Sequence, residues 1–327
     1  MNRFQSILLI ALSVFIASCD NDLDLVSDYE NIPVTYGLLD RSDTAQYIRV
    51  EKAFVDPEKS ALLLAQEPDS LYYEDLVVQL VNRSLNQTYT LERVDGNLEG
   101  YPRDTGIFAS SPNWMYKIRT SDMTMRGGDN FRILIDRGEP FETIEGNTTV
   151  IGDFELIRPR PGSTVDFSGF GDFSVVWTAD PAAAFHDILV RIYISEWETG
   201  SSDPKRVVEI PWTLARSLTD SRVNVPRREF FSLLANRLEA NPNTQRTLDS
   251  MRLEIKAGGD ELYDFIRVSL ANAGITASQD IPRVTNMSEG FGVFSSTNGI
   301  SESDFDFSSN TFDSLTTNTL TRDLNFQ

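Results

Sequence analysis

The stretch "DILVRIYISEW", residues 187–197, places apolar side chains at every second position. The alternating residues are Ile188, Val190, Ile192 and Ile194. They point to one face of an extended chain, because successive side chains alternate across a β-strand. The same period of two recurs in "FRILID" (131–136) and "MRLEIKA" (251–257). The sequence therefore predicts a mainly β protein whose strands each bury one face.

Further strand-like segments fill the N-terminal half and are separated by turns rich in Gly, Pro and Asp. They are "YIRVEKAF" (47–54), "DLVVQLVN" (75–82), "TYTLERV" (88–94) and "WMYKIRT" (114–120). Several short strands at this spacing predict an immunoglobulin-like β-sandwich over residues 29–157. The Leu-rich segment "DPEKSALLLAQEPDS" (56–70) predicts a short helical insert between its strands.

A linker pattern, "RPRPGST" (158–164), marks the boundary to a second β-rich domain over residues 158–327. This domain opens with the strand "FSVVWTA" (173–179) and contains two predicted helices. The first is "PRREFFSLLANRLEAN" (226–241), which starts with proline and buries Phe230, Leu233, Leu234 and Leu238. The second is "DELYDFIRVSLANAG" (260–274), with Asp260 as its N-cap. The predicted fold is thus two immunoglobulin-like β-sandwich domains, the second decorated with helices.

The N-terminus has the layout of a secretory signal peptide over residues 1–18. Its apolar run, residues 4–16, is too short to span a bilayer as a helix. The only cysteine, Cys19, follows, and "IASC" (16–19) resembles the lipobox of bacterial lipoproteins. That resemblance implies cleavage before Cys19 and acylation of its sulfur and amine, which would anchor the chain to a membrane. The alternative is an ordinary signal peptide followed by a chance cysteine.

Residues 19–28 form an acidic segment, for which a solvated tether is the usual role. The segment is also similar to the surface-export signal of Bacteroidota lipoproteins, which places acidic residues just after the lipidated cysteine. Its "DND" (20–22) departs from that pattern, which often has Ser or Lys before the acidic pair. The similarity implies a lipid-anchored protein of the outer membrane that faces the cell exterior.

The charge balance excludes one class of partner. The chain has 49 acidic and 29 basic residues, a net charge of −20, whereas nucleic-acid binding needs clustered Lys and Arg. Its hydrophobic content of 40% and aromatic content of 10% predict a folded body rather than disorder. With Cys19 assigned to lipid, we expect no disulfide, so packing alone must hold the fold.

The segment "DELYDFIRVSLANAGITASQDIPRVTNMSEGFGVFSS" (260–296) resembles the closing part of a family of two-domain, β-rich outer-membrane lipoproteins of Bacteroidota whose function is unknown. The features that carry this resemblance are the pair Tyr263 and Phe265, then Pro282, Asn286 and the "GFGVF" turn (290–294). "YGLLDRSDTAQYIRVEKAF" (36–54) and "AQEPDSLYYEDLVVQL" (65–80) look like the first domain of that family. The resemblance implies a cell-surface role, often beside TonB-dependent receptors for nutrient uptake, and no catalytic residues.

Independently of that resemblance, Gly290 and Gly292 predict a turn, and Phe291 and Phe294 predict a plug in the core.

Few residues offer enzymatic chemistry. His186 is the only histidine, so a Ser-His-Asp triad could use no other base. It stands beside Asp187 at a predicted loop-to-strand junction, where we expect a capping or surface role. A single histidine cannot build a multi-histidine zinc site, and no Gly-x-Ser-x-Gly elbow occurs. We therefore expect no catalytic, cofactor or metal site, although a pair of glycosidase carboxylates cannot be located by sequence.

Two residue sets could still serve a ligand. The four tryptophans could stack on sugar rings, but core packing is commoner for them, above all for Trp177 in "SVVWTA". The segment "SESDFDF" (301–307) has three alternating carboxylates, Glu302, Asp304 and Asp306. It lacks the twelve-residue calcium-loop pattern, so a solvated acidic strand is expected.

Three functions remain open from the sequence. The leading hypothesis is a non-enzymatic, surface-anchored binding or accessory protein that works with an outer-membrane β-barrel receptor in uptake. The alternative is a glycan-active hydrolase that uses two carboxylates. A third hypothesis is a purely structural component of the cell envelope.

Overall fold

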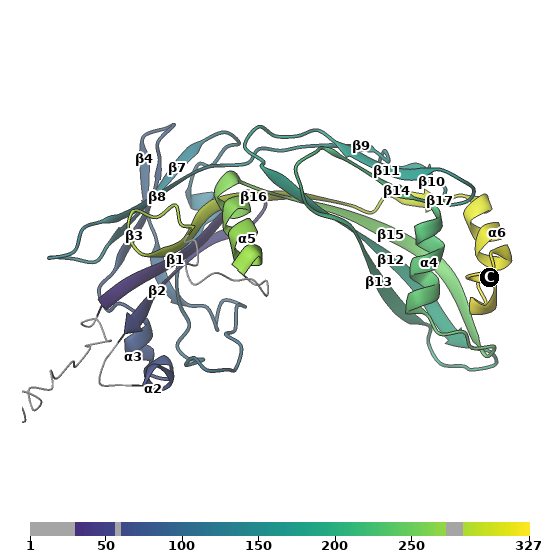
Figure 1. The fold of residues 1–327 in the computed structure, drawn as a ribbon, viewed down its shortest axis with the longest axis horizontal. Coiled ribbons are helices and arrows are strands. Elements are labelled where there is room, and N and C mark those ends of the chain that lie inside the picture. Colours follow the sequence, from purple (N-terminus) through teal and green to yellow (C-terminus); the bar gives the residue numbers. More distant parts are fainter. Residues whose placement is uncertain (1–29, 56–59, 273–283) are drawn as a thin grey trace, which may run out of the picture.

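The computed structural model describes residues 30–55, 60–272 and 284–327. The predicted signal peptide (1–18), Cys19 and the tether (19–28) lie outside these residues, as does Pro282. Figure 1 shows two β-rich lobes joined side by side in an arch. In the part of the chain that the structure describes, no helix combines the length and apolar composition needed to cross a membrane.

The first lobe is a sandwich of two four-stranded layers. One layer has the order β1-β2-β6-β5, with β1 at Glu30–Asp40, β2 at Ala45–Val55, β6 at Trp114–Arg119 and β5 at Glu92–Asp95. The other has the order β4-β3-β7-β8, with β4 at Gln87–Thr90, β3 at Val77–Asn82, β7 at Asn130–Asp136 and β8 at Ile144–Thr149. Lettered A, B, C, C′, D, E, F and G along the chain, these layers are A-B-E-D and C′-C-F-G. This is the strand order of an immunoglobulin sandwich, so the predicted fold of this lobe is confirmed.

The core of the first sandwich lies between its two layers. The predicted alternation of "FRILID" is confirmed, because Phe131, Ile133 and Ile135 of β7 are fully buried. They pack in one hydrophobic cluster with Leu39 of β1 and Ile48 of β2 on the facing layer. Packing between alternating inward side chains of two sheets is what stabilises such a sandwich.

The second lobe repeats the same plan with different edges. One layer has the order β13-β12-β15-β16, with β13 at Arg206–Leu218, β12 at Phe185–Glu198, β15 at Thr244–Gly258 and β16 at Phe291–Glu302. The other has the order β14-β11-β9, with β14 at Arg222–Pro226, β11 at Asp172–Trp177 and β9 at Leu156–Arg158. After β9, the short strand β10 (Ser163–Val165) pairs in parallel with β17 (Phe305–Phe307). Lettered along the chain, β9 is A, β11 is B, β12 is C, β13 is C′, β14 is E, β15 is F and β16 is G. The two layers are then A-B-E and C′-C-F-G, which is again an immunoglobulin-like order.

The helices differ in part from the prediction. Helix α4 (Arg228–Arg237) lies between β14 and β15 and buries Phe230, Phe231 and Leu234 in the second core. Helix α5 (Asp260–Asn272) matches the second predicted helix closely. The predicted insert at 56–70 forms two short helices, α2 (Ala61–Ala65) and α3 (Pro68–Leu71), while 56–59 lie outside the described residues. A further helix, α6 (Ser309–Thr317), was not predicted.

One strand belongs to both lobes. The first half of β16 pairs in parallel with β1, from Phe291 opposite Val34 to Thr297 opposite Asp40. Its second half pairs with β15 in the antiparallel sense. The two lobes therefore share a continuous eight-stranded sheet, β13-β12-β15-β16-β1-β2-β6-β5.

The start of β16 completes the first core from a distant part of the chain. Phe294 of β16 and Met287 just before it both belong to the hydrophobic cluster of the first sandwich. The predicted role as a core plug is therefore confirmed for Phe294, which is fully buried, whereas Phe291 is only partly buried. The predicted domain boundary at residue 157 assigns Met287 and Phe294 to the second domain, although both pack in the core of the first sandwich.

Candidate functional site

The structure places His186 in the second core. It lies near the start of β12, is 1% exposed, and its ring packs edge-on against Trp177 and Phe154 at centroid distances of 5.1 and 5.8 Å. The expected capping or surface role is therefore wrong, because the side chain turns inward with the buried face of the strand. Burial lowers the pKa of His186, against smaller opposite effects of the Leu218 backbone and Asp187. A base in this position does not reach a ligand at the surface.

The tryptophans do not form one platform. Trp177 and Trp212 are buried in the second core, as expected for Trp177. Trp114 lies on β6 in the first sandwich, with the guanidinium of Arg93 4.5 Å from its ring centroid. Trp197 lies near the end of β12, covered by the Lys205 ammonium at 4.1 Å. These positions are distributed over both sandwiches, so a shared sugar-stacking surface does not arise.

The acidic residues of "SESDFDF" do not converge either. Glu302 ends β16, and its carboxylate accepts hydrogen bonds from the backbone N–H groups of Ser303 and Asp304, both at 2.9 Å. Asp306 lies in β17 and is exposed. Among the described residues, no group of three or more His, Cys, Asp or Glu side chains is arranged to hold a metal ion.

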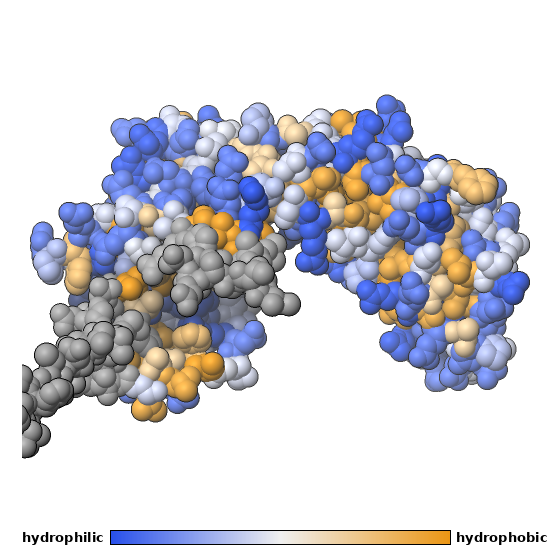
Figure 2. Space-filling view, viewed as in Figure 1, coloured by the Kyte–Doolittle hydropathy of each residue, from blue (hydrophilic) through white to orange (hydrophobic). Residues whose placement is uncertain are grey.

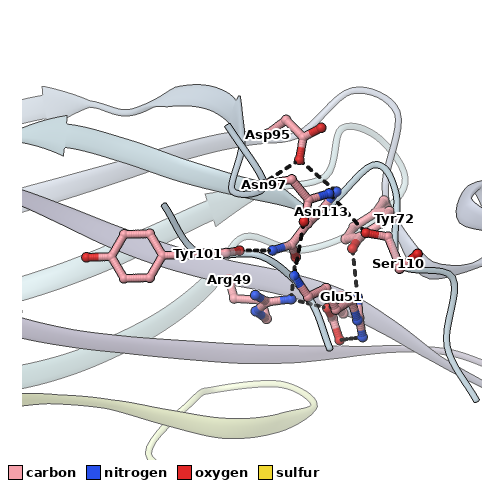
Figure 3. A network of polar contacts seen from close by, with 9 residues as sticks. Arg49, Glu51, Tyr72, Asp95, Asn97, Tyr101, Ser110 and Asn113 are labelled. Carbon is pink, nitrogen blue, oxygen red and sulfur yellow. Dashed lines mark hydrogen bonds and ion pairs between the residues drawn. The ribbon is translucent and has the colours of Figure 1, made fainter. Parts of the chain in front are cut away.

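A different feature stands out in the first sandwich, the long connection between β5 and β6. It covers residues 96–113 and is called the β5–β6 loop below. Connections of this length without secondary structure are uncommon in compact domains, and they frequently carry function. The loop lies against outward-facing residues of β2 and is held there by polar side chains, as Figure 3 shows.

The two ends of the loop are joined by Asp95 and Asn113. The Asp95 carboxylate accepts hydrogen bonds from the N–H groups of Asn97 and Asn113, both at 3.0 Å. The Gly96 N–H donates to the Asn113 carbonyl at 2.7 Å. A carboxylate that accepts from the N–H two residues later is a common way for Asp to fix a turn. The loop thus starts and ends at one fixed point.

Inside the loop, two asparagine side chains act as cross-links. Asn97 donates to the Ser110 carbonyl at 2.9 Å and accepts from the Arg103 N–H at 3.0 Å. Asn113 is fully buried, and its amide donates to the Tyr101 carbonyl at 2.8 Å. Buried polar groups that are paired in this way fix one conformation, because any other would leave them without partners.

The loop is tied to the sheet through charged side chains. Glu51 of β2 accepts from Arg49 on the same face at 2.9 Å and from Arg103 of the loop at 2.8 Å (Figure 3). Arg103 also donates to the Tyr72 hydroxyl at 2.7 Å. The side chains of this ion-pair group are only 15–24% exposed, so they are partly protected from screening. Burial raises the pKa of Tyr72 above its usual value.

The outer side of this locked loop exposes large apolar side chains among polar ones. Ile107 and Phe108 are 56% and 50% exposed, and the neighbouring α2 exposes Leu62 and Leu63 to 60% and 62%. The N–H of Ala109 donates to the carbonyl of Ala65 at 2.7 Å, which joins the loop to α2. Figure 2 shows hydrophobic surface over α2 and its surroundings. We call Leu62, Leu63, Ile107 and Phe108 the apolar surface.

The apolar surface lies at the end of the sandwich where the described chain begins. Glu30 of β1 pairs with Val55 at the end of β2, and α2 begins at Ala61 shortly afterwards. Large apolar side chains gathered in one exposed area are characteristic of interaction sites. The loop carries no sequence motif that predicts a site. The loop could have been recognised by its apolar residues, which follow neither strand nor helix periodicity and stand in a stretch rich in Gly, Pro, Ser and Asn.

The sequence comparisons do not assign a family. No protein-family model matches the chain, and no curated protein matches it. Among solved structures, the chain has a match to the "Crystal structure of DIP-gamma IG1+IG2" at 12% identity, over 86% of this chain and 97% of the other. The TM-score of this match is 0.19, so the assignment of the sandwiches rests on their own strand order.

Proposed function

We propose that this chain is a lipid-anchored, non-enzymatic accessory protein of an outer-membrane receptor, and that the apolar surface is its contact with the receptor. The observation that carries the proposal is the combination of four exposed apolar side chains with a loop fixed by the hydrogen bonds of Asn97 and of the buried Asn113. A surface fixed before binding loses little conformational freedom when it meets a partner, which favours affinity.

The anchor expected at Cys19 supports this placement. The chain between Cys19 and Glu30 could span no more than about 40 Å even when fully extended. The first sandwich, with its apolar surface, would therefore stay close to the membrane surface and to any receptor embedded there. The burial of His186, the only histidine in the sequence, favours a binding role over histidine-based catalysis.

A crosslinked pull-down of the lipidated protein from native outer membranes tests the proposal. We expect a β-barrel receptor to be recovered in a fixed ratio with the wild-type protein. Replacing two exposed residues, Leu63→Ser with Ile107→Ser, should reduce recovery at least about tenfold, since burying one large aliphatic side chain is worth about 1.5–3 kcal/mol. Neither residue takes part in the polar network beneath the loop.

The matched control carries Val207→Ser with Leu320→Ser, which removes two exposed apolar side chains from the second sandwich. It should recover the receptor like the wild type. Recovery of the protein alone would contradict the proposal, and so would equal losses in the two double variants. Turnover of a glycan that stops when one carboxylate is neutralised would favour the hydrolase alternative.

A further inference from the structure

A polar cavity of about 440 Å³ opens on the second sandwich, far along the chain from the apolar surface. It lies between β9, β10, β11 and the residue before α4, where Arg158, Arg160 and Arg227 line it together. Its acidic lining consists of Asp166 and Asp172, so the lining has one more positive than negative group. The whole chain, in contrast, has a net charge of −20. A cationic cavity in so acidic a protein calls for an anionic occupant.

The nearest carboxylate does not neutralise the arginines. Oδ1 of Asp166 accepts from the N–H and hydroxyl of Ser168, at 2.8 and 2.6 Å, and from the Ser308 hydroxyl at 3.0 Å. Its other oxygen is 3.9 Å from Nη1 of Arg227, which is long for a charged pair. Burial alone would raise the pKa of Asp166, but these hydrogen bonds and Arg227 hold it below its usual range. Asp166 therefore serves as a fixed structural acceptor.

The guanidinium groups keep free donors. Within the described part of the chain, Arg158 and Arg160 form no ion pair, and both residues are exposed. Nη1 of Arg227 donates to the Ser168 carbonyl at 3.2 Å, while its Nε is buried without a hydrogen-bond partner among the described residues.

The cavity exists because the chain changes layers at this point. Strand β9 pairs with β11 only at Val176 and Trp177, and the chain then crosses to β10, which pairs with β17. Among the described residues, the segment of β11 from Asp172 to Ser174 has no strand beside it on that edge, and it forms one wall. The hydroxyl-bearing Ser163 and Thr164 of β10 line the opposite wall.

We propose that this cavity binds an oxyanion, the carboxylate or phosphate group of a surface ligand, held by the guanidinium groups of Arg158, Arg160 and Arg227. Guanidinium is the side chain best suited to this task, because its planar donors match two oxygens of a carboxylate or phosphate at once. Ser163 and Thr164 also belong to the lining, and because successive side chains of β10 point to opposite faces, one of their hydroxyl groups supplies a neutral donor beside it. Ile157, also in the lining, is exposed and offers an apolar contact to the rest of the ligand.

Calorimetric titration of the purified full-length protein with citrate and with inorganic pyrophosphate tests the site, at about 20 mM salt so that charge interactions are weakly screened. We expect saturable binding of at least one probe. Binding of citrate alone would identify a carboxylate ligand, and binding of pyrophosphate alone a phosphate ligand. The double variant Arg158→Gln with Arg160→Gln should weaken binding at least about tenfold, since each charged hydrogen bond is strong.

Two further variants make the outcome decisive. Arg227→Gln should also weaken binding, and a thermal melt will show whether α4, which follows it, is intact. The control Arg216→Gln removes one exposed charge from β13, outside the cavity, and should bind like the wild type. The proposal is overturned if neither probe binds, or if binding survives unchanged in the folded double variant. Either result would leave the proposal for the apolar surface untouched.

Discussion

The side chain of Asn113 joins separate parts of the first sandwich from a position with no solvent exposure. Its amide nitrogen donates to Tyr101, 12 residues away, and its oxygen accepts from Arg49, 64 residues away, at 2.8 Å in both cases. Both partners therefore lose a partly buried hydrogen bond if the amide is removed. Sequence patterns report periodicity within a segment, so they could not have paired Asn113 with residues this distant.

We expect Asn113→Ala to lower the free energy of unfolding by about 2–3 kcal/mol, because it leaves buried polar groups unpaired. The β5–β6 loop should also exchange its amide hydrogens faster. Urea unfolding and hydrogen exchange measure the two effects. Asn310→Ala, at an exposed position of α6, should change stability by less than about 0.5 kcal/mol. Equal effects of the two substitutions would contradict the role given to Asn113.

The buried imidazole of His186 makes the fold sensitive to mild acid. Because burial lowers the pKa of His186 in the folded state, the unfolded chain takes up a proton first as the pH falls below about 6.5. Stability should therefore be unaffected by this group above that pH. Below it, stability should fall by at most about 1.4 kcal/mol per pH unit.

The variant His186→Leu tests this expectation, since the chain has no other histidine. Unfolding free energies measured from pH 7 to about pH 5, above the range in which most carboxylates titrate, should fall for the wild type and stay nearly level for the variant. Parallel curves for the two proteins would show that His186 does not titrate differently on unfolding.

At the scale of elements, β16 depends on two glycines that let it approach β1. Gly290 and Gly292 have φ angles of 79° and 108°, which favour glycine. A Cβ atom at Gly292 would lie 1.8 Å from the carbonyl oxygen of Thr35, closer than any real contact. At the predicted turn, Gly290 therefore lies in a bend just before β16, while Gly292 belongs to the strand itself.

Gly292→Ala should destabilise the protein by about 2–4 kcal/mol, through backbone strain and displacement of β16 from β1. The control Gly106→Ala lies in the β5–β6 loop, where an added Cβ meets no atom within 4 Å. It should be close to neutral. Thermal unfolding of the two variants beside the wild type measures the difference, and a harmless Gly292→Ala would contradict the close approach.

Sequence alternation predicted the long central strands well, because each buries one face against a facing sheet. It failed where contacts with distant parts of the chain decide which element forms. The predicted strand 88–94 is divided at buried Leu91 into β4 and β5, which belong to different layers. Strand β13 was not predicted, since Pro211 interrupts its pattern, and proline is tolerated there because β13 is an edge strand. Helix α6 has a mainly polar sequence that buries only Thr311 and Leu315.

Neither candidate binding site could be predicted from sequence. The apolar surface combines α2 with a loop some 40 residues later, and the arginine cavity combines β9 with the residue before α4. Each exists only after the sandwiches have formed. Cys19, the one site residue that the sequence does identify, lies outside the described residues and stays a prediction.

At the scale of the whole molecule, the shared strand makes the first sandwich dependent on the second half of the chain. A fragment that ends at residue 157 lacks Met287, Phe294 and the strand that covers β1. We expect this fragment to be much less stable than the same sandwich in the full chain, because its core is open along β1. Circular dichroism during heating, together with binding of a hydrophobic dye, measures both consequences.

A fragment that melts at the same temperature as the full chain would contradict this expectation. In the intact protein, urea should unfold both sandwiches in one transition, since neither core is complete without β16. Two separated transitions would show that the lobes are independent.

The parallel pairing of β1 with β16 also has a mechanical consequence. In the described part of the chain, β1 begins at Glu30, and the chain continues into the second sandwich from the last residue of β16. If the N-terminus is held and the second sandwich is pulled, the two strands are drawn in opposite directions along their length. The hydrogen bonds between Val34–Asp40 and Phe291–Thr297 then carry the load together in shear, instead of opening one after another. The joint between the lobes is thus suited to resist a force that pulls the two sandwiches apart along these strands.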